Sequence, residues 1–178
     1  MASGYNIEAR FGFWFSQALR TDISYNYING TYDWSTRFRT GTTPFKAHNQ
    51  SNVYMANAYF HPGTWLSGNR SIFDPYFGGG LGVACNRLGI AQSNGLLLSG
   101  GSVDGTGTTN FAARGRAGIL VPLSNCLNLD VNYSIMSLGS FATGSGLNVG
   151  SHHQIPFNGF DFGSNTNGSM NLALVFSR

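Results

Sequence analysis

Period-two alternation is the sequence feature that most constrains how this chain folds. Between residues 127 and 136, LNLDVNYSIM, apolar side chains occupy every second position, and Asn, Asp and Ser occupy most of the positions between them. Successive side chains of a β-strand point to opposite faces, so this pattern predicts a strand with one apolar and one polar face. In a soluble β-protein the apolar face points inward, whereas in a membrane barrel it points outward to lipid. The fold class therefore depends on which face meets the interior.

Six further segments alternate in the same way, which predicts an all-β protein with seven visible strands. The strands are expected at residues 4–16, 19–27, 52–60, 73–85, 110–121, 127–136 and 169–176. Each has about 8 to 13 residues, close to the roughly 9 to 11 with which a tilted strand crosses a bilayer. No apolar run in the sequence reaches the length of about 18 residues that a transmembrane helix needs.

Short and long connections alternate along the chain. Residues 16–18 and 122–126 are predicted to form tight turns, whereas residues 33–51, 88–108 and 138–167 are predicted to form long polar loops. Short turns on one side and long loops on the other are typical of an outer-membrane barrel. Loops of this length are uncommon in a compact soluble domain. We therefore expect one domain, residues 1–178, folded as an antiparallel up-and-down transmembrane β-barrel.

The charged residues support a polar interior. Only 10% of the residues are charged, and Lys46 is the single lysine. A soluble sheet covers its wet face and edges with Lys and Glu, and that covering is missing here. The few charges on the polar strand faces are balanced in sign, as suits a narrow lumen in which opposite charges pair. This predicted lumenal charge network consists of Glu8, Arg10, Arg20, Asp22, Arg114, Arg116 and Asp130.

Strand number and aromatic residues add two expectations. Seven strands would place the two ends of the sheet on opposite sides of a membrane, whereas bacterial single-chain barrels have even strand numbers. One further strand before Gly4 would give an even strand number. The chain is therefore expected to be a truncated eight-stranded barrel that lacks its signal peptide and first strand. Aromatic side chains toward the strand ends predict interfacial girdles. They are Tyr5, Phe15, Tyr27, Tyr59, Phe73, Phe111 and Phe176.

Several of these segments resemble the OmpA-like, opacity-type outer-membrane β-barrel family of Gram-negative bacteria. They are NAYFHPGTW, FDPYFGGGLGVACNRLG and NFAARGRAGILVPLSNCLNLDVNYSIMSLGSF. ARFGFWFSQALRTDISYNY is similar to the family's second and third strands, and MNLALVFSR to its closing strand, although this chain ends Phe-Ser-Arg where the family usually ends on an aromatic residue. The resemblance covers most strand regions and none of the long loops. It implies an eight-stranded outer-membrane barrel, often surface-exposed and immunogenic, and no single biochemical activity.

Other residues that carry chemistry are interpreted structurally. His48, His61, His152 and His153 are predicted to be surface loop residues, because no ligand spacing for a metal accompanies them. FGGGLG is predicted to continue a strand, with its glycines relieving crowding in the lumen, because a phosphate-binding fingerprint would open a helix. Cys85 and Cys126 are expected roughly 25 Å apart on neighbouring strands, hence as free thiols. We expect no enzymatic activity, cofactor or metal.

The expected function is a structural or surface-interaction role, adhesin-like or antigen-like. The monomeric barrel would contact outer-membrane lipid and would bind a host or envelope ligand through the three long loops. Nucleic acid is not expected as a partner, because no cluster of Lys and Arg is present. A narrow porin-like channel is the alternative, with weak anion preference from four lumenal arginines against three carboxylates. A soluble barrel that binds a small apolar ligand is a third interpretation.

Overall fold

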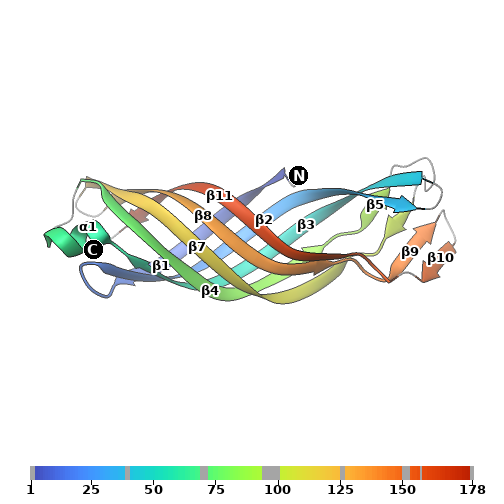
Figure 1. Ribbon diagram of the computed structural model, residues 1–178, viewed down its shortest axis with the longest axis horizontal. Coiled ribbons are helices and arrows are strands. Elements are labelled where there is room, and N and C mark those ends of the chain that lie inside the picture. The colour runs from blue at the N-terminus through green and yellow to red at the C-terminus, as the bar shows by residue number, and fades with distance from the viewer. Residues whose placement is uncertain are drawn as a thin grey trace.

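The computed structural model describes residues 3–38, 41–68, 72–93, 101–124, 127–149, 153–156 and 158–176, which form one sheet and one short helix (Figure 1). The seven long strands are β1 (Ser3–Trp14), β2 (Leu19–Phe38), β3 (Gly41–Phe60), β4 (Asp74–Leu88), β7 (Thr106–Ser124), β8 (Leu127–Ala142) and β11 (Asp161–Phe176). Four short strands lie at one end of the molecule, which we call the loop end: β5 (Ala91–Ser93), β6 (Ser102–Val103), β9 (Gly146–Val149) and β10 (His153–Pro156). Helix α1 (Pro62–Ser67) lies at the opposite end, the α1 end.

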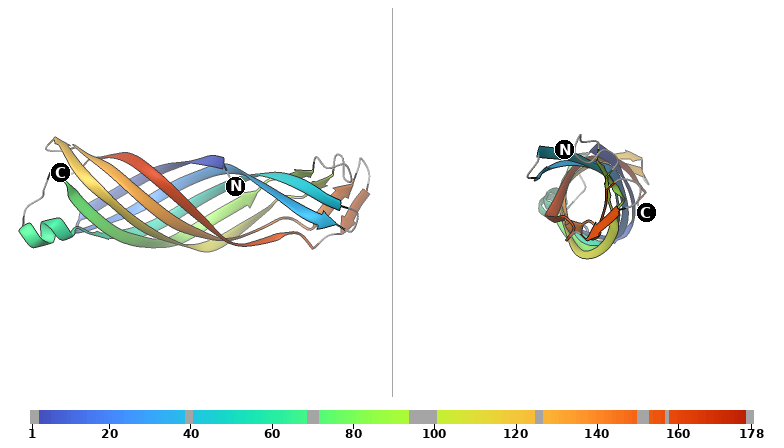
Figure 2. Two further views of the ribbon diagram at one scale, coloured as in Figure 1. Left: turned by 45° about the horizontal axis from the view of Figure 1, so that its top comes forward. Right: turned by 90° about the vertical axis from the view of Figure 1, so that its right-hand side faces the viewer.

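The long strands pair in chain order, β1-β2-β3-β4-β7-β8-β11, and every pairing is antiparallel. Figure 2 shows the sheet curling about its long axis, so that one face becomes an inside and the other an outside. The predicted all-β, antiparallel, up-and-down arrangement of seven long strands is confirmed. Within the described residues β1 pairs only with β2, and β11 only with β8, so the curl is open between these two strands.

The curl turns the apolar strand faces outward. In β8, the side chains of Val131, Tyr133 and Ile135 are exposed, whereas Asp130 and Asn132 on the alternate face are buried. The other long strands repeat this arrangement, with large exposed side chains such as Phe11, Leu81 and Leu172. Over most of its length the sheet therefore has its apolar face outside and its polar face inside, which is the reverse of a soluble barrel.

The predicted long loops are wrong, because β-structure occupies much of all three ranges. Residues 33–51 lie mostly in the β2–β3 hairpin. Residues 88–108 contain β5, β6 and the start of β7, and residues 138–167 contain the end of β8, β9, β10 and the start of β11. The period-two pattern continues there with its polarity reversed. In β3, Phe45 and Ala47 point inward and are buried, whereas Lys46 and His48 point outward and are exposed.

The reversal occurs at one row of the sheet. Tyr25, Tyr54, Val83 and Phe111 are register partners on β2, β3, β4 and β7, and all four are exposed apolar or aromatic residues. We call these four residues the boundary row. Four residues further toward the loop end on each of these strands, the outward positions are Asn29, Gln50, Arg87 and Gly107. The outer surface thus changes from apolar to polar along every one of these strands at the same level of pairing.

The connections agree with the sequence at several points. The predicted turn at residues 16–18 joins β1 to β2, and FGGGLG lies within β4 as expected of a strand. Helix α1, which the sequence analysis did not predict, follows β3. No helix in the described part of the chain is long and apolar enough to cross a bilayer. Cys85 is a free, exposed thiol, as predicted, and Cys126 lies outside the described residues.

Candidate functional site

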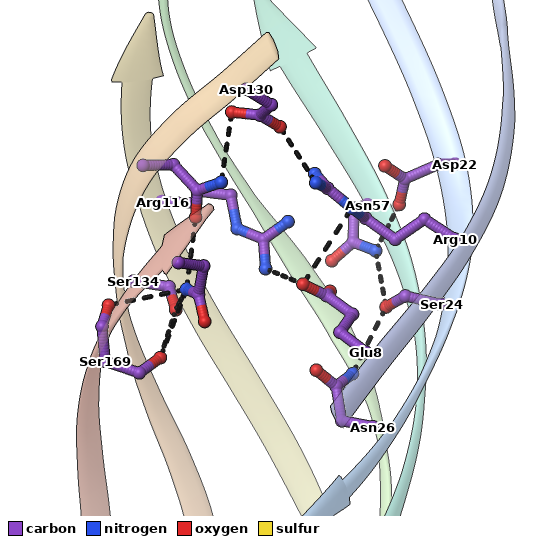
Figure 3. Close-up of polar contacts among 12 residues, drawn as sticks. Glu8, Arg10, Asp22, Ser24, Asn26, Asn57, Arg116, Asp130, Ser134 and Ser169 are labelled. Atoms are coloured by element: carbon purple, nitrogen blue, oxygen red, sulfur yellow. Dashed lines mark hydrogen bonds and ion pairs between the residues drawn. The ribbon is translucent and has the colours of Figure 1, made fainter. Parts of the chain in front are cut away.

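Glu8 of β1 is the centre of the lumenal charge network, the seven charged residues that the sequence predicted inside the barrel. Its Oε1 accepts a hydrogen bond from Nη1 of Arg114 at 2.6 Å. Its Oε2 accepts one from Nη2 of Arg116 at 2.5 Å, and Figure 3 shows this second contact. Both arginines are nearly fully buried, and they occupy successive inward positions of β7. One carboxylate therefore bridges two cations across the lumen, between strands 106 to 108 residues apart in sequence.

Arg10 extends the network toward β8. Its Nη2 donates to Oδ2 of Asp130 at 2.8 Å, and its Nε lies 3.8 Å from Oε2 of Glu8. The other oxygen of Asp130 accepts from the hydroxyl of Tyr76 at 2.7 Å and from the amide of Asn132 at 3.0 Å. The Asp130 carboxylate is fully buried, and these three donors replace the water that it would otherwise bind.

Asn57 connects Asp22 to the same network through uncharged groups. Its Oδ1 accepts from Nη2 of Arg114 at 2.8 Å, and its Nδ2 donates to Oδ1 of Asp22 at 2.5 Å. Ser24 receives hydrogen bonds from Arg114 at 2.8 Å and from Asn57 at 3.1 Å, and Asn26 accepts a longer one from Arg114 at 3.3 Å. Among the described residues, Asp22 is thus held by an amide and not by an arginine.

Arg20 departs from the predicted role as an ion-pairing residue. Among the described residues no carboxylate lies within ion-pair distance of its guanidinium, which sits 4.7 Å from the ring centre of Tyr59 and 5.0 Å from that of Tyr76. The ring centre of Trp14 lies 5.9 Å from the same guanidinium. Cation–π contacts of this kind are strongest when desolvated, and Arg20 is buried. The predicted girdle position of Tyr59 is also wrong, because its ring is buried inside the curl and Phe60 takes the outward position.

Apolar layers enclose the charge network on both sides along the barrel axis. Toward the loop end lies the mid-lumen cluster of Ile28, Val53, Met55, Ala84, Ala112, Met136, Leu138 and Phe141. Toward the α1 end lies the α1-end cluster of Tyr59, Tyr76 and Leu120, with Trp14 and Val175 packed against it. The order of the three layers can be followed along the inward face of β3. There Asn57, which hydrogen-bonds to the charge network, lies between Met55 of the mid-lumen cluster and Tyr59 of the α1-end cluster. Apart from Arg20, whose guanidinium lies against the rings of the α1-end cluster, the charges are therefore separated from both ends of the lumen by packed apolar side chains.

The inward glycines of β4 provide the space that this packing needs. A Cβ at Gly80 would lie 2.7 Å from the carbonyl oxygen of Ala56 and would press against the side-chain amide of Asn57. A Cβ at Gly78 would lie 2.7 Å from the Cα of Tyr59. These contacts support the prediction that FGGGLG relieves crowding in the lumen. On the outer face of β7, by contrast, a Cβ at Gly115 would meet nothing within 4 Å.

His61 is not a surface residue, contrary to the prediction. It is completely buried between the end of β3 and helix α1, with its Nδ1 2.8 Å from Oδ2 of Asp74. The other oxygen of Asp74 accepts from the hydroxyl of Thr64 at 3.1 Å, so one carboxylate fixes α1 against the start of β4. His48 is exposed as predicted. His152 and the side chain of His153 lie outside the described residues.

Sequence reasoning placed all seven charged residues of the network inside the curl but missed the neutral groups that complete it. Asn57, Ser24 and Asn132 share the inward parity of those charges, and this parity is the signal that could have identified them. The network is suited to stabilising the fold, because its carboxylates already accept hydrogen bonds from arginines and amides. No three His, Cys, Asp or Glu side chains in the described ranges are placed so that they could hold a metal ion.

Comparisons with known proteins add no relative to this picture. No family model, curated protein sequence or solved structure matches the chain.

Proposed function

We propose that this chain is an outer-membrane β-barrel protein of the OmpA-like, opacity-type kind, with a structural or surface-interaction role at its loop end. The observation that carries the proposal is the outward apolar face combined with a charged and hydrogen-bonded interior. Water would leave side chains such as Phe11, which is 77% exposed, and Leu172, 72% exposed, without contacts, whereas lipid tails would cover them. A continuous apolar exterior of this extent is also far larger than the patches on soluble monomers.

The height of the apolar exterior matches a bilayer. From Tyr5 of β1 to Phe15, which directly follows the strand, the outward residues are all exposed, and their ten residue steps span roughly 33 Å at about 3.3 Å each. At a strand tilt of about 40° this corresponds to a belt about 25 Å tall, the height typical of outer-membrane barrels. The apolar exterior reaches further on β1, where Tyr5 is the register partner of Asn29, than on β2, β3, β4 and β7. On those four strands the boundary row would mark the outer lipid–water interface, with Tyr25, Tyr54 and Phe111 as interfacial aromatic residues.

Surface interaction is proposed for the part of the molecule beyond the boundary row. There Phe45, Ala47, Leu88, Ala91 and Val103 form a second apolar core, against which Trp34, Phe160 and Phe162 pack. This core, which we call the loop-end core, holds polar outward residues such as Asp33 and Lys46 on paired strands. A binding surface on such strands is preorganised, which lowers the entropic cost of binding a partner.

The layered interior favours this role over the narrow channel. An ion would have to pass the α1-end cluster, the ion-paired network and the mid-lumen cluster in turn. Apolar constrictions of this kind oppose conduction by excluding water, and the four arginines are engaged by carboxylates, amides or ring faces. We expect no conductance steps when the refolded protein is added to planar bilayers. Steps with anion preference would favour the channel instead.

The lipid-facing exterior is tested by one substitution on each side of the boundary row. Leu81 points outward in the middle of the apolar belt, and Leu81→Arg is expected to cost about 2–4 kcal/mol of folding free energy in lipid vesicles. His48→Arg is the matched control, because His48 points outward beyond the boundary row and is exposed. Its expected effect is within about 0.5 kcal/mol. Equal and small effects of the two substitutions would contradict membrane insertion.

A further inference from the structure

One edge of β7 is uncovered at the loop end, although β7 lies in the middle of the sheet. β7 pairs with β4 from Thr106 to Leu120, but its pairing with β8 extends toward the loop end only as far as Ala113, the partner of Ser137. Residues 106–112, which we call the β7 edge, therefore have one neighbouring strand among the described residues. An uncovered edge presents backbone N–H and C=O groups that can pair with another extended chain.

β8 leaves this edge because it crosses to the inner side of β7. Gly139 turns the strand with φ +74°, and a Cβ there would press against the Cβ of Asn110, an inward residue of β7. From the far side of β7, Nδ2 of Asn86 on β4 donates to the carbonyl oxygen of Leu138 at 2.8 Å. Nδ2 of Asn110 donates to the carbonyl oxygen of Ser140 at 2.7 Å. Inward side chains thus hold β8 beneath β7, and the ladder between the two strands is not continued.

The β7 edge carries none of the usual protections of an edge strand. Phe111 belongs to the boundary row, so residues 106–110 lie on its loop-end side, outside the expected lipid. The sequence of the edge, TGTTNFA, contains no proline and no charged residue. Proline and lysine are common means by which proteins stop an edge strand from pairing with another chain. The edge is therefore open to pairing at the end of the molecule for which surface interaction is proposed.

A groove accompanies the β7 edge on the outer surface. It has a volume of about 540 Å³ and is lined by residues 105–109 at the start of β7, residues 85–89 at the end of β4, and Asn52 of β3. Arg87 is exposed and is the one charged residue of this lining. No carboxylate in the described part of the chain lies within ion-pair distance of Arg87. The groove therefore has the charge to receive an acidic side chain.

Gly107 leaves a path between Arg87 and a strand added at the β7 edge. It is the register partner of Arg87 and occupies an outward position. A Cβ at Gly107 would only touch the carbonyl oxygen of Asn86 at 3.6 Å, so packing within the protein does not require glycine here. A residue opposite Gly107 on an added strand would lie two strand spacings from Arg87, roughly 9.6 Å. Arginine and glutamate side chains together span that distance across a glycine.

We propose that the β7 edge binds an extended segment of a partner protein, which pairs antiparallel to β7 and places an acidic side chain opposite Gly107. The inference rests on the proposed surface-interaction role of the loop end and names the kind of partner. Main-chain hydrogen bonds along the β7 edge supply affinity, and the groove at Arg87 supplies specificity, as in other cases of strand addition. The segment is limited to about seven residues, because β8 pairs with β7 from Ala113 onward.

A second copy of the chain fits this edge less well. Two copies inserted the same way in one membrane hold their β7 strands in the same direction, so their β7 edges could meet only as parallel strands. All strand pairings between the described residues are antiparallel. The β7 edge also carries no acidic residue that could enter the groove of another copy. A separate acidic segment has neither restriction.

The test uses a capped synthetic peptide, Thr-Val-Thr-Cys-Thr-Glu-Thr, designed so that its cysteine lies opposite Thr109 and its glutamate opposite Gly107. The protein carries Cys85→Ser, Cys126→Ser and Thr109→Cys, which leaves one thiol at an exposed outward position of β7. Neighbouring strands lie about 4.8 Å apart, within the roughly 7 Å between Cα atoms that a disulfide can join. The linked fraction is measured by intact-protein mass spectrometry after equilibration in glutathione buffer, with the protein in detergent.

The matched control protein carries His48→Cys in place of Thr109→Cys. His48 is also exposed and outward beyond the boundary row, but its strand β3 has bonded neighbours on both sides. Thr31 of β2 is its register partner, and the N–H of Gly89 donates to its carbonyl oxygen at 2.7 Å. Linkage to Thr109→Cys is expected at least about tenfold above linkage to His48→Cys, a ratio that corresponds to roughly 1.4 kcal/mol of pairing free energy.

Two N-methylated peptides report on backbone pairing. In a strand added at an edge, alternate N–H groups face the sheet and the others face away from it. Methylation of one alternate set is expected to lower linkage at least about tenfold, because each lost hydrogen bond is worth roughly a two- to tenfold change. Methylation of the other set removes no hydrogen bond to the sheet and should change linkage by less than about twofold.

The acidic preference is tested by replacing the peptide glutamate with glutamine and by Arg87→Gln in the protein. Each change alone should lower linkage by about two- to fivefold, the size expected of an exposed ion pair. The two changes together should lower linkage no further than either alone, because both remove the same contact.

Three results would overturn the inference. They are equal linkage to Thr109→Cys and His48→Cys, equal effects of the two N-methylated peptides, and additive effects of Arg87→Gln and the peptide glutamine. All measurements are made in detergent, so they do not depend on insertion into a bilayer, which Leu81→Arg tests separately. Peptide binding that none of these changes affects would overturn the β7 edge as the site while leaving a surface role for the loop end.

Discussion

Replacement of Glu8 by Gln would remove one negative charge from the centre of the lumenal charge network while keeping the size and shape of the side chain. Arg114 and Arg116 donate to separate oxygens of this carboxylate at 2.6 and 2.5 Å, and both guanidinium groups are nearly fully buried. After the change the two cations share a neutral amide, whose single oxygen accepts hydrogen bonds and whose NH₂ group faces a cation. The buried interior then carries one more uncompensated positive charge than before the change.

The size of the effect follows from this geometry. Removal of one partner from a buried ion pair costs about 3–5 kcal/mol of folding free energy. The Gln oxygen can still accept from one arginine, and the Glu8 side chain retains slight contact with solvent, so we expect the lower end of that range, about 3 kcal/mol. The loss can be measured by urea unfolding of the refolded protein in lipid vesicles, followed by tryptophan fluorescence.

Two further variants decide whether charge is the cause. Asp33→Asn removes the same charge from an exposed outward position of β2 and should change the free energy of unfolding by less than about 0.5 kcal/mol. Glu8→Gln combined with Arg116→Gln restores the charge balance and should recover at least about 1 kcal/mol relative to the sum of the single changes. The reasoning is refuted if Glu8→Gln is as mild as Asp33→Asn, or if the double variant is simply additive.

Two other substitutions test the packing of the lumen and of the α1 end. Gly80→Ala should cost about 1–3 kcal/mol, because its Cβ would press on the Asn57 amide and the β3 backbone, whereas Gly115→Ala has open space and should be nearly neutral in the same urea titration. Asp74→Asn should cost about 1–3 kcal/mol by weakening its hydrogen bonds with His61 and Thr64. It should also speed proteolytic cleavage within residues 62–68, and an unchanged cleavage rate would contradict the role of Asp74 in fixing α1.

The strand faces within the apolar belt could be predicted from the sequence because they follow from parity alone. Once Ile23 and Leu81 are placed outward, Asp22 and Gly80 must point inward, whatever the rest of the chain does. The predicted location of all seven charged residues inside the curl depended on nothing else. Their individual partners could not be predicted, because the pairing of Glu8 with Arg114 depends on the curvature and register of the whole sheet.

The errors have two physical causes, of which the first is that the polarity of the outward strand face changes along the molecule. Phe45 of β3 points inward, although toward the α1 end of the same strand the apolar side chains point outward. A prediction that assumes one apolar face for the whole strand therefore assigns residues 33–51 to a loop. His61 and Tyr59 were placed at the surface because turns and strand ends are usually exposed. Helix α1 and Asp74 cover His61, and the barrel wall encloses Tyr59, through contacts that no local pattern reveals.

The part of the β2–β3 hairpin beyond the boundary row limits how the sequence and the length of the loop-end surface can change. Because the strands remain paired up to Phe38 and Gly41 and their side chains alternate, an insertion of one residue into either strand would exchange inside and outside for every position toward the tip. Trp34 and Phe45 would then leave the loop-end core. Length changes in this hairpin should therefore be tolerated in steps of two residues on each strand, whereas outward positions such as Lys46 and His48 can change freely. Proteins that share this hairpin are therefore expected to differ in its outward side chains far more often than in its length.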